Sequence, residues 1–173
     1  GIASLTRKYV QAVEGTGVVI LDTRKTTPNL RYFEKWAVKI GGASNHRFGL
    51  YDMIMIKDNH VDYAGGIAKA IELANNYLRE NSFSVPIEIE TRSIDELKQV
   101  LEHGGVQRIM LDNFSVEQVR EALKLIDKRY ETEVSGGIHL ESIRAYAEEK
   151  PDYISVGALT HSYTSLDISL KAI

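Results

Sequence analysis

Residues 18–28 read VVILDTRKTTP and set a pattern that the rest of the chain repeats, a short apolar run that ends in charged residues. The run at residues 18–21 predicts a buried strand. Arg24 and Lys25 follow it, and Pro28 keeps the residue before it out of the helical region. A helical pattern then begins, so the two cations lie on a strand-to-helix turn where backbone N–H groups and side chains can bind an anion together. A single pair of cations on a turn is more often only solvated, so the other strand ends decide between the two interpretations.

The strand pattern recurs along the chain and indicates one α/β architecture. Strand and helix signals alternate, as parallel βαβ units require. In the third strand, Ile87 and Ile89 alternate with Glu88 and Glu90. A strand of a doubly wound sheet is apolar on both faces, whereas a barrel strand can direct polar side chains into the lumen. We therefore expect an incomplete (β/α) barrel of about six or seven parallel strands, with its active site at the C-terminal strand ends. The predicted strands are residues 18–22, 53–57, 85–90, 108–112, 131–135 and 152–156, with residues 166–170 as a candidate seventh.

Helix signals lie between the predicted strands. After Pro28, one helical face is marked by Leu30, Phe33, Ala37 and Ile40. Two later helices begin at predicted capping boxes, Ser93 with Glu96 and Ser115 with Gln118.

Composition limits the function classes. The 173 residues are enough for one domain with a full core, and the net charge of −3 argues against general nucleic-acid binding. The chain has no cysteine, which excludes disulfides and thiolate chemistry and fits a reducing, cytoplasmic location. No apolar segment is long enough to span a membrane. We expect residues 1–14 to form a helix that links to an absent N-terminal domain, and residues 15–173 to form the barrel.

Chemically useful groups follow nearly every predicted strand. Barrel folds build their active sites at these C-terminal strand ends. A chance occurrence is plausible for one strand but not for six in series. The groups are Arg24 with Lys25, Lys57, Glu90, Asp112, Ser135 to Gly137, and Gly157.

Lys57 allows three interpretations. It follows four apolar residues, so we expect its stem to be buried and its charge to be paired in the lumen with Glu88 or Glu90. A desolvated lysine could instead be a Schiff-base nucleophile. The surrounding cations and carboxylates favour an electrostatic role.

Glu90 and Asp112 end neighbouring predicted strands and could share a divalent cation. Magnesium takes carboxylate oxygens alongside substrate phosphates. The alternative is a pair of lumen carboxylates neutralised by lysines, and the residues alone leave both interpretations open.

The late strands end in glycine-rich segments that suit a phosphate. Ser135-Gly136-Gly137 and Gly157-Ala158 let backbone amides approach an anion closely, at the position where barrels often hold phosphate. Each segment alone would be a weak signal. The histidines at positions 46, 60 and 161 do not have compact metal-ligand spacing.

Taken together, these motifs resemble quinolinate phosphoribosyltransferase over essentially the whole chain. The matching segments are residues 22–28 (DTRKTTP), 45–47 (NHR), 49–50 (GL), 56–60 (IKDNH), 111–114 (LDNF), 135–137 (SGG) and 156–161 (VGALTH). The resemblance implies transfer of a phosphoribosyl group from phosphoribosyl pyrophosphate to quinolinate. Decarboxylation would give nicotinate mononucleotide, pyrophosphate and CO₂, with Mg²⁺, in NAD biosynthesis.

The resemblance also implies a role for each site residue. Arg24, His46, Arg47 and Lys57 would hold the carboxylates of quinolinate, with Thr23 beside them. Lys25, Glu90 and Asp112 would handle pyrophosphate and its magnesium, which makes Lys57, Glu90 and Asp112 the catalytic set and Glu90 and Asp112 the metal ligands. Ser135, Gly136, Gly137, Gly157, Ala158 and His161 would seat the ribose 5-phosphate.

Two features differ from the family pattern. Asn29 stands where the family usually has glycine, and asparagine tolerates a left-handed turn. The family also carries an N-terminal domain that completes the site of a neighbouring subunit, so we expect a homodimer or higher homo-oligomer. The alternatives are a related phosphoribosyltransferase with another acceptor and a fragment that binds ligands without turnover.

Overall fold

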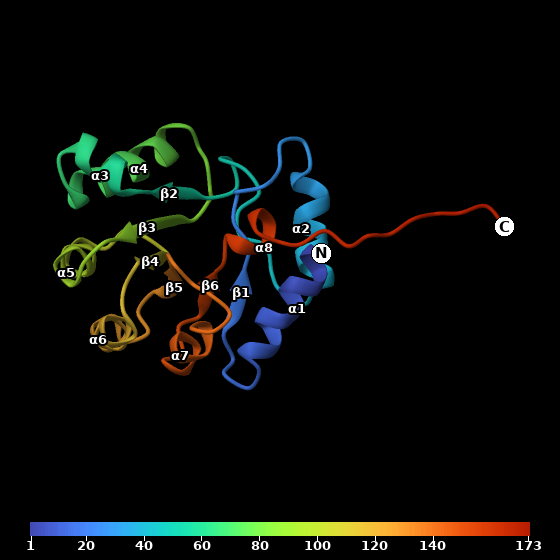
Figure 1. Ribbon diagram of the computed structural model, residues 1–173. Helices are drawn as coiled ribbons and strands as arrows, with labels where there is room; N and C mark the ends of the chain where they lie inside the picture. Colours follow the sequence, from blue (N-terminus) through green and yellow to red (C-terminus); the bar gives the residue numbers. More distant parts are fainter.

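The computed structural model describes residues 1–173 and contains one six-stranded parallel sheet surrounded by helices (Figure 1). The strands lie in the order β1-β6-β5-β4-β3-β2. Their bounds are β1 Val19–Leu21, β2 Ile54–Ile56, β3 Ile87–Thr91, β4 Arg108–Asp112, β5 Glu131–Ser135 and β6 Tyr153–Ser155. All six predicted strands are confirmed, and all neighbours pair in parallel.

The sheet curves without closing, which confirms the incomplete barrel. β1 and β2 are its two edges and do not pair with each other. A single parallel bridge joins Leu21 of β1 to Ser44, so the segment after α2 runs along the β1 edge. The Ser44 N–H donates to the Ile20 carbonyl at 2.9 Å. The seam between β1 and β2 is therefore lined by a loop, and this loop carries residues 45–47.

The candidate seventh strand is wrong. Residues 166–170 form no strand, and Leu166, Ile168 and Leu170 all project into solvent. Figure 1 shows this C-terminal segment extending away from the body of the molecule. An alternating apolar run becomes a strand only where it pairs with a sheet edge, and this segment pairs with neither β1 nor β2.

Eight helices accompany the strands and cover the outside of the sheet (Figure 1). They are α1 Ile2–Ala12, α2 Arg31–Ile40, α3 Asp58–Ala64, α4 Ile67–Glu80, α5 Ile94–His103, α6 Val116–Ile126, α7 Ile143–Glu148 and α8 Ala158–His161. None of them combines the length and the hydropathy that a membrane crossing would need. The Ser115–Gln118 capping box is confirmed in both directions, and Ser93 caps α5 by accepting the Glu96 N–H.

Alternation along β3 separates the apolar core from the lumen. Ile87 and Ile89 belong to a cluster of 30 buried apolar residues that the helices cover. Glu88 and Glu90 are also buried, at 0% and 8% exposure, yet they contact polar partners rather than that cluster. The lumen of this barrel is therefore polar, as the sequence predicts.

Helix α2 forms where expected but buries a different face. Phe33 and Ile40 are 60% and 65% exposed, whereas Glu34, Lys35 and Val38 face inward and are buried. Packing alone would favour the apolar face. The observed orientation instead brings Lys35 to the end of β1, where a buried carboxylate needs a cation.

Gly41, directly after α2, lies against α1 and provides a test of this packing. A Cβ at Gly41 would lie 2.5 Å from Thr6 Cβ and 2.7 Å from the Ala3 carbonyl oxygen. The backbone there is right-handed, at φ −69, so alanine would be strained only by this contact. We expect Gly41→Ala to lower the free energy of unfolding by about 1–3 kcal/mol in urea titrations. Lys39→Ala, on the exposed side of α2, is the matched control, and an equal effect in both variants would contradict the packing.

Candidate active site

The C-terminal strand ends surround one cavity of about 840 Å³. Every predicted site residue lines it, although the predicted strands lie far apart in the sequence. These residues are Thr23, Arg24, Lys25, His46, Arg47, Lys57, Glu90, Asp112, Ser135, Gly136, Gly137, Gly157, Ala158 and His161. The structure therefore brings the set together, while the role of each residue stays a prediction. Sequence reasoning missed Asn113 and Glu133 on the wall and the residues that support the cavity from behind.

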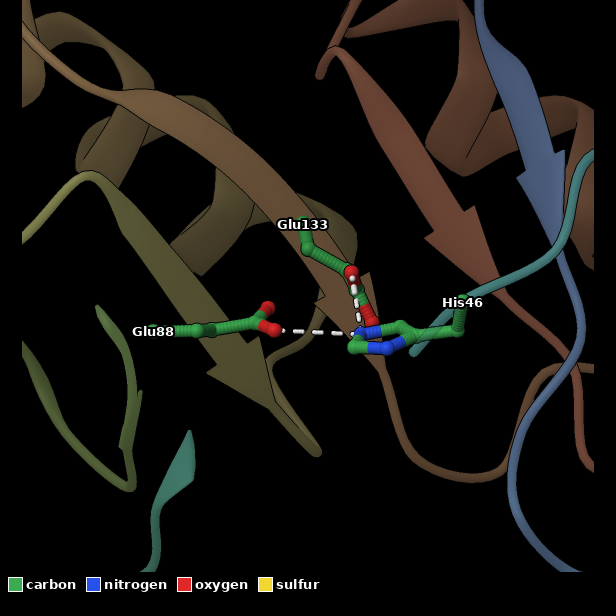
Figure 2. A group of neighbouring side chains, drawn as sticks. All are labelled: His46, Glu88 and Glu133. Carbon is green, nitrogen blue, oxygen red and sulfur yellow. Dashed lines mark ion pairs between the residues drawn. The ribbon is translucent and has the colours of Figure 1, made fainter. Parts of the chain in front are cut away.

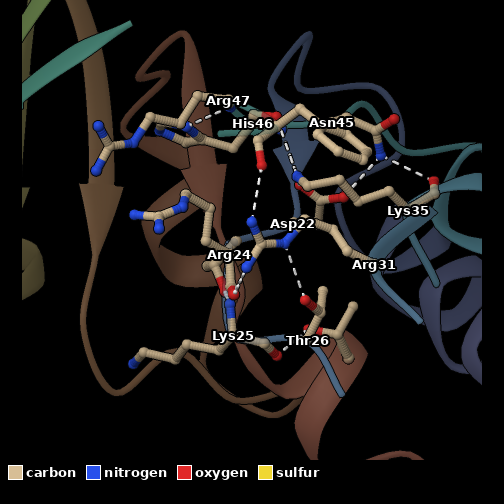
Figure 3. Close-up of polar contacts among 12 residues, drawn as sticks. Asp22, Arg24, Lys25, Thr26, Arg31, Lys35, Asn45, His46 and Arg47 are labelled. Carbon is tan, nitrogen blue, oxygen red and sulfur yellow. Dashed lines mark hydrogen bonds and ion pairs between the residues drawn. The ribbon is translucent and has the colours of Figure 1, made fainter. Parts of the chain in front are cut away.

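Asp22, at the end of β1, is the anchor of the cationic wall (Figure 3). Its Oδ1 accepts from Lys35 Nζ at 2.5 Å and from the His46 backbone N–H at 2.8 Å. Its Oδ2 accepts from Asn45 Nδ2 at 2.6 Å. Lys35 Nζ also donates to the His46 carbonyl at 3.0 Å. One buried carboxylate thus joins β1, α2 and the loop that presents His46 and Arg47.

Burial opposes both charges of the Asp22–Lys35 pair. The side chains are 0% and 2% exposed, and burial raises the pKa of Asp22 and lowers that of Lys35 despite their mutual attraction. A pair that costs this much desolvation is a poor source of stability. Its consequence is geometric, because five hydrogen-bonding groups meet at the end of β1. They are the Asp22 carboxylate, the Lys35 ammonium, the Asn45 side-chain amide, and the N–H and carbonyl of His46. The helical pattern of the sequence gave no signal for a buried Lys35.

Arg31 braces the turn that carries Arg24 and Lys25. Its Nε donates to Thr26 Oγ1 at 3.1 Å, and Nη2 donates to the Arg24 carbonyl at 3.2 Å. Its Nη1 donates to the Phe48 carbonyl at 3.1 Å. The same guanidinium therefore links the turn after β1 to the loop that holds Arg47 (Figure 3).

Arg24 and Arg47 make the cavity wall strongly cationic. Both are half-buried, and neither forms an ion pair with a carboxylate. Burial and the charge of Arg24 lower the pKa of Arg47, and Arg24 Nε is buried without a hydrogen-bond partner. Arg47 Nη1 donates only to the Met53 carbonyl, at 3.0 Å. Two guanidiniums with unused donors have the charge and geometry that suit a multiply charged carboxylate.

Lys57 lines the cavity together with Glu90 and Asp112. Its Nζ lies 2.5 Å from Glu90 Oε2, and its side chain is 45% exposed. The stem is thus less buried than predicted, because β2 is an edge strand. Since the ammonium is paired and solvent-accessible, the structure does not supply the desolvation that a Schiff-base lysine needs.

Asp112 ends β4, next to the strand of Glu90, as predicted. Burial and the nearby Glu90 raise the pKa of Asp112, and its Oδ2 accepts from Asn113 Nδ2 at 2.6 Å. One oxygen of each carboxylate thus has no hydrogen-bonding partner and is available to a ligand. Carboxylate oxygens on the wall of an anion-binding cavity are a donor set that suits Mg²⁺.

The glycine segments form the remaining wall. Gly136 and Gly137 have φ of 88 and 61, and their N–H groups donate to no backbone acceptor. A Cβ at Gly136 would clash with Asn113, whose backbone N lies 2.8 Å from that position. At Gly157, a Cβ would lie 2.9 Å from His161 Nε2. Gly136 therefore needs glycine, whereas at Gly157, where φ is −64, only the end of the His161 side chain would have to move.

His46 reaches past the cavity wall into the lumen, where two buried carboxylates meet it (Figure 2). Its Nε2 lies 3.0 Å from Glu88 Oε2 and 3.1 Å from Glu133 Oε2. Although burial opposes the charge, the two carboxylates raise the pKa of His46 above its ordinary value. Burial and Glu133 raise the pKa of Glu88 to about 7. The sequence predicted a lumen position for Glu88 but a lysine partner, and it gave no role to Glu133.

Comparison with known proteins assigns the family. Residues 2–171 match the family model for the quinolinate phosphoribosyl transferase C-terminal domain. The chain belongs to this family. A quinolinate phosphoribosyltransferase (decarboxylating) from Nicotiana glauca is 46% identical over 185 residues, which cover 99% of this chain and 52% of the relative. A probable nicotinate-nucleotide pyrophosphorylase (carboxylating) from Bacillus subtilis is 46% identical over 170 residues, which cover 98% of this chain and 57% of the relative.

Solved structures of relatives share the fold. NadC from Streptococcus pyogenes superposes with a TM-score of 0.91 at 46% identity, covering 99% of this chain and 59% of that one. The chain spans little more than half the length of the relatives it matches. The family's C-terminal domain is thus the incomplete barrel, with the cavity at its C-terminal strand ends.

The buried Asp22–Lys35 pair gives a stability prediction. Lys35→Met leaves Asp22 buried without its cation, so we expect a loss of about 3–5 kcal/mol in the free energy of unfolding. Asp22→Asn added to Lys35→Met should recover part of that loss, because the uncompensated charge disappears. Urea titrations measure both effects, and Lys39→Met on the exposed face of α2 is the control. A loss below about 1 kcal/mol for Lys35→Met would contradict the role given to the pair.

Glu88 gives a pH prediction. Because folding raises its pKa from 4.5 to about 7, the folded state binds more protons than the unfolded state in this window. The stability contributed by the protonated group is complete below the unfolded pKa and is lost as the pH rises through about 7. Each pKa unit corresponds to about 1.4 kcal/mol, so wild type should lose a few kcal/mol relative to Glu88→Gln between pH 5 and pH 8. Urea titrations of both proteins across this range measure the difference between their free energies of unfolding. A difference that does not change with pH would contradict the prediction.

Proposed function

We propose that this domain binds quinolinate and phosphoribosyl pyrophosphate and catalyses their conversion to nicotinate mononucleotide, pyrophosphate and CO₂. The observation that carries the proposal is the pair of guanidiniums without carboxylate partners, Arg24 and Arg47, opposite Glu90 and Asp112 in one cavity. A dicarboxylate and a magnesium-bound pyrophosphate are the two kinds of ligand that these walls complement. Relatives that match almost the whole chain carry the names quinolinate phosphoribosyltransferase and nicotinate-nucleotide pyrophosphorylase.

The acceptor occupies the cationic wall in this proposal. Arg24 and Arg47 each offer guanidinium donors for a carboxylate, and Thr23, His46 and Lys57 line the same cavity. Planar bidentate pairing would fix the pyridine ring in one orientation. The ring nitrogen, which is not paired with any donor in this arrangement, would then face the ribose.

The phosphoribosyl group occupies the glycine wall. The free amides of Gly136 and Gly137 and the short α8 after Gly157 would bind the 5-phosphate, with Ser135, Ala158 and His161 beside it. Thr160 Oγ1 donates to the Lys25 carbonyl at 2.8 Å and so joins this wall to the turn after β1. In this proposal Lys25 would lie between the phosphate and the pyrophosphate.

Glu90 and Asp112 would hold Mg²⁺ through their free oxygens. Bound there, the cation would neutralise charge on the pyrophosphate leaving group. Lys57 and Lys25 line the same cavity and would add positive charge on the protein side.

The chemistry needs positioning and electrostatics rather than a covalent enzyme nucleophile. The bond from the ribose C1′ to pyrophosphate breaks as the pyridine nitrogen forms its bond to C1′. The developing negative charge on pyrophosphate is stabilised by the cations around it. The quaternised ring then accepts the electron pair left at C2 when the adjacent carboxylate departs as CO₂, and C2 takes a proton. Arg24, Arg47 and the backbone cradle hold the two substrates in line for these steps.

The exposed apolar face of α2 supports association with a further protein surface. Tyr32, Phe33, Trp36 and Ile40 are each more than half exposed, and Tyr32 and Phe33 pack edge to face at 5.5 Å. Exposed patches of this kind mark interfaces. We propose that this face lies in a homo-oligomer in which an N-terminal domain of a neighbouring subunit completes the cavity. The cytoplasmic location also stays a prediction.

Two alternatives use the same cavity. A related phosphoribosyltransferase would accept another pyridine carboxylate, and a binding domain would hold the ligands without turnover. Carboxyl-labelled quinolinate separates them when it is supplied with phosphoribosyl pyrophosphate and Mg²⁺. Release of labelled CO₂ together with mononucleotide supports the proposal. Mononucleotide formed only from nicotinate supports the first alternative, and calorimetric binding of quinolinate without product supports the second.

Arg47 tests the acceptor site. Lysine retains the positive charge but cannot form a bidentate pair with a carboxylate. We expect Arg47→Lys to weaken quinolinate binding about tenfold or more, while the affinity for phosphoribosyl pyrophosphate changes less than about twofold. Calorimetry with each ligand measures both affinities. Equal losses for the two ligands would show that Arg47 does not belong to the acceptor site.

A further inference from the structure

The cluster of His46, Glu88 and Glu133 lies at the buried end of the cavity, where His46 and Glu133 line the wall, and substrate contacts alone do not explain it. Figure 2 shows the imidazole between the two carboxylates, which come from β3 and β5. Both glutamates are 0% exposed, and apart from the His46 ring nitrogen the Glu88 oxygens have no donor nearby. The cluster thus places two buried acids against one ring.

The contact of His46 Nδ1 shows which nitrogen of the ring carries the proton and whether the cluster suits a metal ion. The Arg47 backbone N–H donates to His46 Nδ1 at 2.7 Å, so Nδ1 must carry a lone pair. Although the two carboxylates raise the pKa of His46 to about 9, a charged ring would carry a second proton on Nδ1, directly against the Arg47 N–H. This contact therefore keeps the ring neutral, with its proton on Nε2, the atom that lies 3.0 and 3.1 Å from the carboxylates. The three side chains also have the spacing of a metal site. A metal-bound histidine, however, normally donates from its second nitrogen, and here the second nitrogen accepts.

We propose that Glu133 and Glu88 are positioning residues that hold His46 as its Nε2–H tautomer and thereby seat Arg47. The carboxylates favour a proton on Nε2, and the free Nδ1 then receives the Arg47 amide. Because Arg47 Nη1 also donates to the Met53 carbonyl, the residue is held at both ends. The inference rests on the proposed function only for the identity of the ligand that Arg47 binds.

The two glutamates contribute unequally. Glu133 Oε2 lies 3.3 Å from Arg108 Nη1, so Glu133 has a cationic partner that keeps it ionised. Arg108 is itself held by Glu131 at 2.8 Å and stacks over the Tyr153 ring at 4.0 Å from its centroid. Glu88 lacks such a partner at hydrogen-bonding distance. Glu133 is therefore the main anion behind His46, and a neutral residue of the same shape should replace Glu88 more readily.

The ring nitrogens provide a direct test in the unmodified protein. Protein labelled with ¹⁵N-histidine is measured at pH 7 by long-range ¹H–¹⁵N correlation. We expect a protonated Nε2 and an unprotonated Nδ1 for His46. A proton on Nδ1 would overturn the proposal, and so would Zn²⁺ that binds with a change in the His46 signals.

Matched Glu→Gln variants then test the link to Arg47. Glu133→Gln should mix the His46 tautomers and weaken calorimetric binding of pyridine-2,3-dicarboxylate about tenfold, with inorganic phosphate affinity changed less than about twofold. Glu88→Gln should have a smaller effect on both readouts. Glu131→Gln removes the exposed partner of Arg108 on the same strand and is the control. Equal effects of Glu133→Gln and Glu131→Gln would overturn the proposal.

The outcomes separate this inference from the proposed function. If the unmodified protein does not bind the dicarboxylate, the proposed function fails, while the His46 tautomer and its response to Glu133→Gln still test the cluster. Thermal unfolding shows whether each variant is folded. If Glu133→Gln does not fold, the tautomer in the unmodified protein and Glu133→Asp, which keeps the charge, decide the matter.

Discussion

The buried ion pair between Asp22 and Lys35 is the interaction on which the cavity depends. Asp22 ends β1, Lys35 comes from α2, and both hydrogen-bond to the backbone of His46. Taking two charges out of water is costly, and this cost selects a single arrangement of strand, helix and loop. It explains why α2 buries Lys35 and leaves Phe33 and Ile40 in solvent. The orientation of the helix follows from an electrostatic requirement rather than from its apolar residues.

A second set of charges continues through the lumen. His46 lies between Glu88 and Glu133, and Arg108 forms an ion pair with Glu133. These groups take the place of the branched apolar layers that usually fill a small barrel. Because the sheet does not close between β1 and β2, the loop with His46 enters at the seam and meets the lumen acids. The open seam and the polar lumen are therefore parts of one arrangement.

The two walls of the cavity differ in how they are built. Arg24 and Arg47 are placed by a network of side chains that reaches back to α2 through Arg31 and Lys35. The glycine wall is placed by backbone conformation, since Gly136 has a positive φ and cannot carry a Cβ beside Asn113. A wall built from side chains can be retuned by single substitutions, whereas the backbone cradle depends on the strands themselves.

Much of this arrangement could be predicted from local patterns. Alternating strand and helix signals located all six strands, and the charged or glycine-rich strand ends identified part of the cavity lining, while the family resemblance added residues such as His46 and Arg47. The alternation of Ile87, Glu88, Ile89 and Glu90 predicted a polar lumen, which distinguishes a barrel from an open sheet. These features depend on neighbours along the chain or on the rule that parallel strands end at one edge. The sequence motifs also indicate the family to which the chain belongs.

Other features depend on groups that meet only after folding. Nothing near Lys35 in the sequence shows that its charge will be buried against Asp22, and residues 166–170 have a strand-like pattern but pair with neither edge of the sheet. Glu133 looks like an ordinary member of a weak strand until His46 and Arg108 approach it from distant segments. The sequence by itself determined the elements, their order and the chemistry at their ends, because these follow from periodicity and local conformation. Only the tertiary structure decided which buried charges are partners, because that depends on distances between segments remote in the chain.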